Sequence, residues 1–575
     1  MERRVFVAIL LSFAVLYGYQ ALFVPPQKPK VDVVEPKEKL AQPAPQAAPT
    51  VVEQAPAEQE PAAQISDTAE REVVVETATS EVVLTNRGGQ VLHWLLKDYR
   101  DAAGKPVDLV PSGVPTDQPR PFTLVVDDAA ITRRLSAALY RVSGDAGGRV
   151  DATRQAATVS FEYANDAGLR VRKDFRFDPK NFVVAFSTDV VNGGQSLNPT
   201  IAWGPGLGDA GASAGGGSFF TGNYVQPPQA IFELDGDVTR IAASKVAEQP
   251  AHEGDFRFGG VDDHYFLAAA LMPGKARLEY KPVTLPGPNN TQRQLLAHTI
   301  RLPQSPKDVR FFVGPKQFDL LQSIDVQLVN AINFGKFRVL SVPLLTSLKW
   351  VHGFIGNWGW SIIVLTIIIN LLIFPLRHKS LVSMRRMQAL QPQLKAIQDR
   401  YSGLKMTDPG RQKMQTEIMA LYKEKGVNPA SGCVPMLLTL PVLFAFYSLL
   451  SQSIELRGAD FGWWIKDLSE RDPLYITPVL MAVTMFWQQK MTPSTADPAQ
   501  QRIMMMMPLM FGVMFLAAPS GLVLYWFVGN LFAIGQQYFT NWWIGPPAMA
   551  NVRPPAERRI KSAGSGRTAG AENKN

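Results

Sequence analysis

The sequence contains few of the residues on which metal and redox sites depend. Its 575 residues include one cysteine, Cys433, and six histidines. A single cysteine excludes an intrachain disulfide and any site built from several thiolates of this chain. Residues 206–218, GLGDAGASAGGGS, lack the Gly-Lys-Ser/Thr ending of a phosphate-binding loop, which indicates a flexible loop. We therefore expect no Cys-rich metal site.

Carboxylates are missing from the long apolar runs in the second half of the chain, and no internal repeat is visible. Ion-coupled transporters usually have an internal repeat and charged residues within their spans. This argues against a small-solute transporter, which stays an alternative. An enzyme acting on sugars is a second alternative. Its one local cluster with acid–base potential, DDHYF at residues 262–266, is interpreted more simply as a turn with buried aromatic rings.

The first half of the chain is typical of a soluble domain, apart from its start. Residues 1–24 place Arg3 and Arg4 before about 20 mostly apolar residues without a small-residue cleavage site, which predicts a transmembrane anchor rather than a cleaved signal peptide. Residues 25–66 are rich in Pro, Ala, Gln and Glu and predict a disordered linker. Residues 67–325 carry short β-branched runs between turn signals, which predicts a large antiparallel β-sandwich.

The second half contains five apolar runs of membrane-spanning length. A surface-lying amphipathic helix is expected before them, over residues 326–357, where Lys and Trp are interspersed. Loops are expected at residues 453–473 and 492–502. The predicted spans are 358–376, 432–452, 474–491, 503–519 and 521–540, which gives six with the N-terminal anchor.

Positive charge indicates the orientation of these spans. Residues 377–426 hold 11 Lys or Arg against 4 Asp or Glu, and the tail 541–575 is also basic. The positive-inside rule places both termini in the cytoplasm and the β domain outside. Residues 377–426 predict a helical hairpin, which either caps the bundle or docks an acidic partner such as ribosomal RNA. Its candidate docking residues are Arg385, Arg386, Lys395, Arg400, Arg411 and Lys413.

Asn370 lies in the middle of the 358–376 span, with Thr366 one turn before it and Arg377 two turns after it. These three residues share one helical face by the i, i+4, i+7 rule, although Pro375 lies between them and is able to kink that face. A polar group at such depth needs a partner or water. A hydrated groove satisfies this need, and so does a hydrogen bond to a neighbouring helix.

Several motifs in one order resemble the YidC-type membrane protein insertases, in the long form of Gram-negative inner membranes. They are TNRGGQV, VDDHYFLAA, LKWVHGFIGNWGWSIIVLT, ALYKEKGVNPASGCVPMLLTLPVLFAFY, LMAVTMFWQQKMTP and PSGLVLYWFVGNL. The resemblance implies a polytopic α-helical membrane protein with six transmembrane helices, five of which form the insertase core, and a large periplasmic antiparallel β-super-sandwich. It implies a groove that opens to cytoplasm and lipid, and it implies no cofactor, no metal and no covalent chemistry.

The resemblance also assigns roles to residues. Position 370 usually carries an arginine in the groove, so Asn370 puts the attraction of acidic substrate tails in doubt and leaves Arg377 to supply the charge. Thr439, Tyr525 and Trp526 match groove positions, with ordinary aromatic packing as the alternative for the last two. Leu443 and Phe444 match positions where the family contacts substrate spans. Met506 and Met510 are expected to contact them too, because flexible thioethers adapt to many apolar partners, with simple exposure to lipid as the alternative. The implied partners are nascent membrane proteins, the Sec translocon, the ribosome, the signal recognition particle with its receptor, and membrane lipids. A scaffold without its own insertase activity is the remaining alternative.

Overall fold

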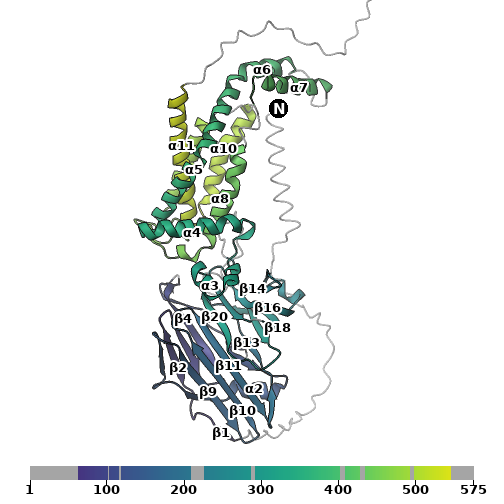
Figure 1. Cartoon of the computed structure of the whole chain (residues 1–575), viewed down its shortest axis with the longest axis vertical. Helices are drawn as coiled ribbons and strands as arrows, with labels where there is room; N and C mark the ends of the chain where they lie inside the picture. Colours follow the sequence, from purple (N-terminus) through teal and green to yellow (C-terminus); the bar gives the residue numbers. More distant parts are fainter. Residues whose placement is uncertain are drawn as a thin grey trace, which may run out of the picture. The chain divides into compact units, whose positions relative to one another are not determined.

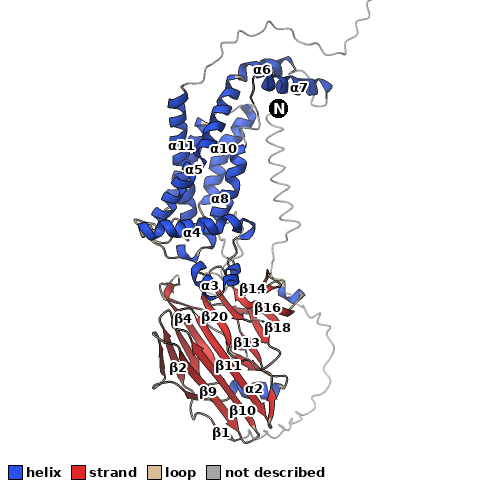
Figure 2. Cartoon of the chain, in the orientation of Figure 1, coloured by secondary structure: helices blue, strands red, loops and turns tan. Residues whose placement is uncertain are grey.

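The structure of the chain is a computed structural model. It describes residues 62–101, 103–115, 118–208, 226–272, 274–286, 292–401, 408–427, 434–492 and 498–545. The predicted anchor, residues 25–61 of the predicted linker and the tail from residue 546 lie outside the described residues. Within them, the strands come first along the chain and the long helices follow (Figures 1 and 2).

Most described strands belong to one antiparallel sheet, whose main path runs β1-β9-β10-β11-β20-β17-β16-β18-β19-β13-β6. Residues alternate between buried and exposed along β10, so one face of this strand covers the core. The strands are β1 (Ala63–Ile65), β6 (Thr123–Val125), β7 (Arg141–Ser143), β9 (Ala157–Asn165), β10 (Leu169–Phe177), β11 (Val183–Asn192), β12 (Gln195–Leu197), β13 (Thr200–Trp203), β14 (Gln229–Leu234), β15 (Asp237–Ala242), β16 (Ala251–Asp262), β17 (Phe266–Leu271), β18 (Lys275–Pro286), β19 (Gln292–Arg301) and β20 (Val309–Pro315).

A smaller sheet packs against the larger one and completes a sandwich. Trp94 of the smaller sheet lies against Phe177 of β10, with ring centroids 6.1 Å apart, and both side chains belong to one continuous hydrophobic core. A short helix, α2 (Ala129–Ala137), starts where the Asp128 carboxylate accepts hydrogen bonds from two backbone N–H groups. The smaller sheet has the order β5 (Pro106–Asp108), β4 (Gln90–Arg100), β3 (Ser80–Thr85), β2 (Glu72–Thr77) and β8 (Arg149–Ala152).

Two details of the β domain differ from the sequence-based expectation. Residues 63–65, assigned to the linker, form β1 and pair with β9, because a short strand takes its structure from the edge that it joins. The pairing of β2 with β8 is parallel rather than antiparallel. The long connection between these two strands permits this arrangement, which a hairpin would not.

Lys173 is buried at the centre of the sandwich. Its ammonium donates hydrogen bonds to the carbonyl oxygens of Gly88, Gly89 and Phe122, at 2.6, 3.1 and 2.8 Å. Gly88 and Gly89 both have positive φ, a conformation that glycine adopts without strain. The turn in TNRGGQV is therefore fixed by a lysine from the opposite sheet.

The helices follow the β domain. Among the described residues, α5 alone is long and apolar enough to cross a membrane by length and composition, and shorter apolar stretches occur at Pro441–Gln452 and Met504–Phe515. The prediction of six spans thus rests on the sequence. The helices are α3 (Phe318–Ile324), α4 (Arg338–Ile355), α5 (Trp358–Ala389), α6 (Gln391–Arg400), α7 (Pro409–Glu424), α8 (Val434–Gln452), α9 (Ile476–Met491), α10 (Pro498–Phe515) and α11 (Ser520–Ile544).

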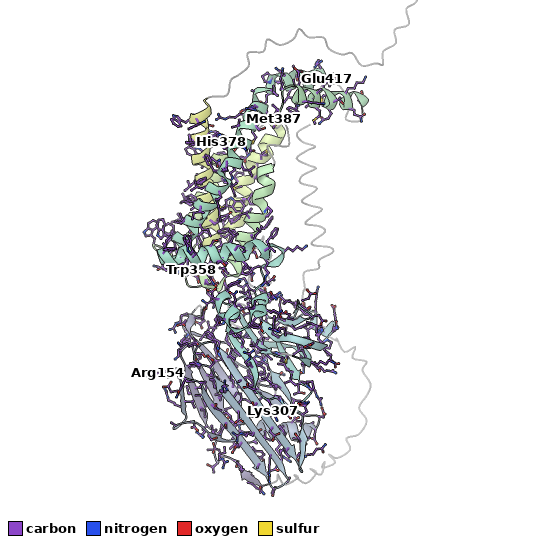
Figure 3. All side chains as sticks on the ribbon, in the orientation of Figure 1. Arg154, Lys307, Trp358, His378, Met387 and Glu417 are labelled. Carbon is purple, nitrogen blue, oxygen red and sulfur yellow. The ribbon has the colours of Figure 1, made fainter. Side chains whose placement is uncertain are left out.

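Helix boundaries differ from the expected ones in two places. The amphipathic helix expected over 326–357 is regular only from Arg338. Two short 3-10 turns precede it, Val326–Ala331 and Gly335–Phe337, and the second begins at Gly335, whose φ of 59° is not helical. The expected boundary at residue 376 is absent, since α5 continues to Ala389. Figure 3 labels Trp358, His378 and Met387 along this helix. Pro375 removes one helical hydrogen bond without ending the helix.

The described helices are tied to the β domain by polar contacts. The His264 Nε2–H group donates to the Ser451 carbonyl oxygen of α8 at 2.6 Å. Lys349 of α4 forms ion pairs with Asp319 and Glu455, each at 3.0 Å. The Asp263 carboxylate accepts two backbone N–H groups that follow it. The DDHYF segment is therefore a turn beside α8, in agreement with the interpretation of this cluster as a turn rather than an acid–base site.

Candidate functional site: a buried polar seam between apolar helices

Three polar side chains of α5 are connected along one helical face. Thr366 and Asn370 are buried. The Asn370 Nδ2 donates to the Thr366 carbonyl oxygen at 2.7 Å, and the Thr366 hydroxyl donates to the Ile362 carbonyl oxygen at 2.6 Å. The Arg377 guanidinium donates to the Asn370 Oδ1 at 2.8 Å. The kink that Pro375 was able to cause does not separate Asn370 from Arg377.

Helix α11 continues this polar region from the facing side. The Gln536 Nε2 donates to the Phe374 carbonyl oxygen of α5 at 3.2 Å. The Thr540 hydroxyl lies 3.3 Å from the His378 ring nitrogen, also on α5. Both α11 side chains are buried. We call Thr366, Asn370, Arg377, Gln536 and Thr540 the polar seam.

A further amide of α11 points toward α9. Asn530 is buried, and its Nδ2 lies 3.4 Å from the Met481 carbonyl oxygen and 3.5 Å from the Thr484 hydroxyl. These separations are at the outer limit of a hydrogen bond. Asn530, Gln536 and Thr540 were not among the predicted site residues. Polar residues inside the apolar run 521–540 were the signal that could have identified them.

The two predicted groove aromatics occupy different surroundings. Tyr525 stacks on Phe446 of α8, with ring centroids 4.3 Å apart and planes 9° apart, and it lies close enough to Arg377 for an electrostatic interaction. Trp526 instead packs against Phe511 and Phe515 of α10, at 5.9 and 4.9 Å between centroids. The structure thus connects Tyr525 with the seam, whereas Trp526 is held in an aromatic cluster.

The residues predicted to contact substrate spans are largely exposed. Phe444 is 47% exposed, Met506 62% and Met510 52%, and Leu443 is partly buried. Phe444 also stacks on Phe337, before α4, with centroids 5.5 Å apart. Exposed apolar side chains on apolar helices suit contact with lipid or with another apolar helix. The side chain of Thr439, predicted for the groove, lies outside the described residues.

The basic hairpin has its own small core. Leu394 and Ile397 of α6 pack against Ile418 of α7. Glu417, labelled in Figure 3, accepts hydrogen bonds from Tyr401 at 2.7 Å and Arg400 at 3.0 Å. This core gives α6 and α7 a fixed pairing.

The candidate docking residues of the hairpin divide into two groups. Arg386, Lys395 and Lys413 are exposed. Arg385 instead donates to the Gly545 carbonyl oxygen at 2.9 Å and to the Asn541 side chain at the end of α11. Its guanidinium thus connects α5 to the end of α11, which differs from the docking role predicted for it. The side chain of Arg411 lies outside the described residues.

Comparison with known proteins accounts for both parts of the chain. Residues 72–347 match the family model described as YidC periplasmic domain, and residues 350–545 match the model described as 60Kd inner membrane protein. A membrane protein insertase YidC of Geobacter metallireducens is 35% identical over 568 residues, which cover 94% of this chain and 98% of the relative. The chain belongs to the YidC family.

Other relatives agree with this assignment. A membrane protein insertase YidC of Syntrophus aciditrophicus is 32% identical over 568 residues, covering 94% of this chain and 99% of the relative. Among solved structures, an active YidC insertase with its first transmembrane domain resolved aligns with 82% of this chain and 94% of its own, at 20% identity and a TM-score of 0.34. The β-sandwich of this chain corresponds to the family model of the YidC periplasmic domain, and the helices that follow correspond to the model of the 60Kd inner membrane protein.

Family membership gives the α5 contacts a specific meaning. The resemblance noted from the sequence implies an arginine at position 370, where this chain has Asn370. Here the nearest arginine on the same face is Arg377, and its guanidinium reaches back to the Asn370 amide oxygen. Arg377 lies seven residues after Asn370, about two helical turns or roughly 10 Å along the helix axis, but its side chain brings the positive charge back to within 2.8 Å of the Asn370 amide oxygen.

Proposed function

We propose that this chain is a membrane protein insertase and chaperone in which the polar seam forms a hydrated groove for the polar tails of substrates. The connection from Thr366 through Asn370 to Arg377 is the observation that carries this proposal. A spanning helix gains nothing from such groups unless they are partnered or hydrated, because each unsatisfied polar group in lipid costs several kcal/mol. A groove that supplies water and hydrogen bonds lowers the cost of moving a polar tail across the bilayer.

The division of roles follows from chemistry. The Asn370 amide donates and accepts hydrogen bonds, so it interacts with neutral and charged tails alike. Arg377 supplies the positive charge and attracts acidic tails, a role that Asn370 cannot perform. The exposed Phe444, Met506 and Met510 form the apolar surface along which a substrate span moves out into lipid.

The topology and the remaining partners belong to the same proposal. Six spans, with both termini in the cytoplasm and the β domain in the periplasm, agree with the distribution of basic residues. The exposed Arg386, Lys395 and Lys413 of the hairpin suit an acidic partner, such as ribosomal RNA or a targeting factor. Cooperation with the Sec translocon is part of this proposal and rests on the family resemblance.

Insertion by the purified chain alone separates this proposal from a scaffold without insertase activity. The chain is reconstituted in liposomes and given a single-span substrate with a short tail, and the fraction of tail that becomes protected from protease is measured. We expect protection above that of empty liposomes. Protection that requires added translocon would favour the scaffold.

Site-specific photocrosslinking tests the groove directly. A photoreactive residue replaces Asn370, and ribosome-bound nascent chains present either an acidic or a neutral tail. We expect crosslinks to both tails, with an excess for the acidic tail that Arg377→Gln removes. Crosslinks at Leu443 without any at position 370 would show that Asn370 only makes hydrogen bonds within α5.

A further inference from the structure

A pocket lies where the β domain meets the beginning of α4. Its volume is about 250 Å³, and its lining comes from β15, from the segment after the 3-10 turn Val326–Ala331, and from the first residue of α4. The polar lining residues are Arg240, Asn330, Asn333 and Arg338. None of these residues belongs to the polar seam or to the hairpin.

Two arginines, Arg240 and Arg338, line this pocket and repel each other. Arg240 is held in place, because its guanidinium donates to the Asn330 and Ala331 carbonyl oxygens at 3.0 and 2.8 Å. Arg338 forms no hydrogen bond or ion pair with any residue in the described part of the chain. Burial and the positive charge of Arg240 both lower the pKa of Arg338. An anion between the two guanidinium groups would relieve this repulsion.

The acidic groups around the pocket only partly compensate these charges. Asp262 lies 3.8 Å from Arg240 and pairs more closely with Lys316, at 2.9 Å. Glu233 is buried and attracts Arg338, and burial raises the pKa of its carboxyl group. The pocket therefore keeps a net positive charge in a partly buried setting, where a charge-assisted hydrogen bond is strong.

We propose that this pocket binds a phosphate group between the Arg240 and Arg338 guanidinium groups, presented by a lipid headgroup or free in solution. Planar guanidinium groups match the oxygen geometry of phosphate. The Asn333 side-chain amide lines the same pocket and adds a hydrogen-bond donor.

The surroundings favour a lipid as the source of the phosphate. Arg338 begins α4, and this helix exposes Val339, Trp350 and Phe354 at 83%, 64% and 75%. Spacings of 11 and four residues place these three side chains on one side of the helix. An exposed apolar stripe with tryptophan is typical of a helix at a membrane surface. A pocket at the start of that helix would lie at the level of lipid headgroups.

Native mass spectrometry of the full-length chain in detergent tests the proposal with phosphatidylglycerol as the probe. We expect a retained lipid adduct that Arg338→Gln weakens about tenfold, the loss of one charge-assisted hydrogen bond. Lys336→Gln is the matched control, because Lys336 is an exposed cation two residues away that does not line the pocket. It should leave the adduct unchanged.

A second variant guards against local misfolding. Asn333→Asp keeps an acceptor for the Gly335 N–H group, which now bonds the Asn333 Oδ1 at 3.3 Å, and places a negative charge in the pocket. We expect the same loss of lipid as with Arg338→Gln. If Arg338→Gln and Asn333→Asp retain as much lipid adduct as Lys336→Gln, the phosphate is not supplied by a lipid.

Glycerol 1-phosphate, measured by titration calorimetry, distinguishes the two sources. If Arg338→Gln loses the binding heat of glycerol 1-phosphate but keeps the lipid adduct, the site binds a soluble phosphate. If neither probe distinguishes Arg338→Gln from Lys336→Gln, the pocket is not a phosphate site. These outcomes are independent of insertase activity, so a failure here leaves the function proposed for the seam intact.

Discussion

Replacing Asn370 with leucine should slow insertion of tailed substrates by about fivefold. Leucine has a similar volume but provides neither the donor to Thr366 nor the acceptor that Arg377 uses at 2.8 Å. Both hydrogen bonds of Asn370 lie within α5, and a hydrogen bond contributes about 0.5–1.5 kcal/mol net. A loss of about 1 kcal/mol corresponds to roughly a fivefold change.

The assay is the liposome reaction with purified chain, in which protease protection of the tail is followed over time. Asn370→Gln keeps the amide and should recover most of the rate. Ile369→Leu is the matched control, because it changes the adjacent position without a polar group and should insert at the wild-type rate. Neutral and acidic tails should slow alike with Asn370→Leu, since Arg377 keeps its charge.

One result would refute this reasoning. If Asn370→Leu inserts both tails at the wild-type rate and unfolds at the wild-type temperature, the amide does not contribute to the path of the tail. A reduced unfolding temperature with an unchanged rate would assign Asn370 to helix packing alone.

Three further predictions concern the rest of the chain. Lys173→Met should destabilise the β domain by roughly 3 kcal/mol, because three buried carbonyls lose their donor; chemical denaturation of the full chain measures this. Burial lowers the pKa of Lys173 to about 7. Between pH 7 and the ordinary value of 10.5, the unfolded chain therefore binds more protons, and stability should rise with pH in wild type but not in Lys173→Met. Gly260→Ala should disrupt the pairing of β16 with β17, because the added methyl group would overlap the Ala268 carbonyl oxygen; hydrogen exchange at these strands should increase. Lys395→Glu with Lys413→Glu should weaken ribosome binding and reduce its salt dependence, whereas Lys466→Glu in the 453–473 loop should change neither.

Each of these predictions has an outcome that contradicts it. An unchanged pH slope in Lys173→Met would assign the slope to other groups. Protected amides in Gly260→Ala would mean that the strands shift to accept a methyl group. A loss of ribosome binding with Lys466→Glu equal to that of the hairpin variant would indicate a general effect of charge.

The sequence predicted the secondary structure of the β domain and the shared face of α5, because both depend on local periodicity. Short β-branched runs between turn signals predicted a large β-sandwich over residues 67–325, and helical spacing placed Thr366, Asn370 and Arg377 on one face. The sequence did not reveal the parallel pairing of β2 with β8, because that pairing depends on chain segments far apart in sequence.

The sequence also did not predict the direction in which a long side chain points. Arg385 and Arg386 are adjacent and were both expected to dock a partner, yet Arg385 reaches the end of α11 while Arg386 is exposed. Which of two neighbouring arginines faces another helix depends on the rotation of α5, and one sequence does not determine this rotation. Gln536 was missed for the same reason, since its role depends on which side of α11 faces α5.

The continuity of α5 gives this helix a mechanical role. Arg377 and Ala389 are twelve residues apart on a single helix, a distance of about 18 Å at 1.5 Å per residue. A helix transmits displacement along its axis without a hinge, so a force applied where α6 begins reaches Arg377 through rigid backbone. A particle that binds the hairpin and shifts it would therefore also shift the Arg377 guanidinium and its contact with Asn370.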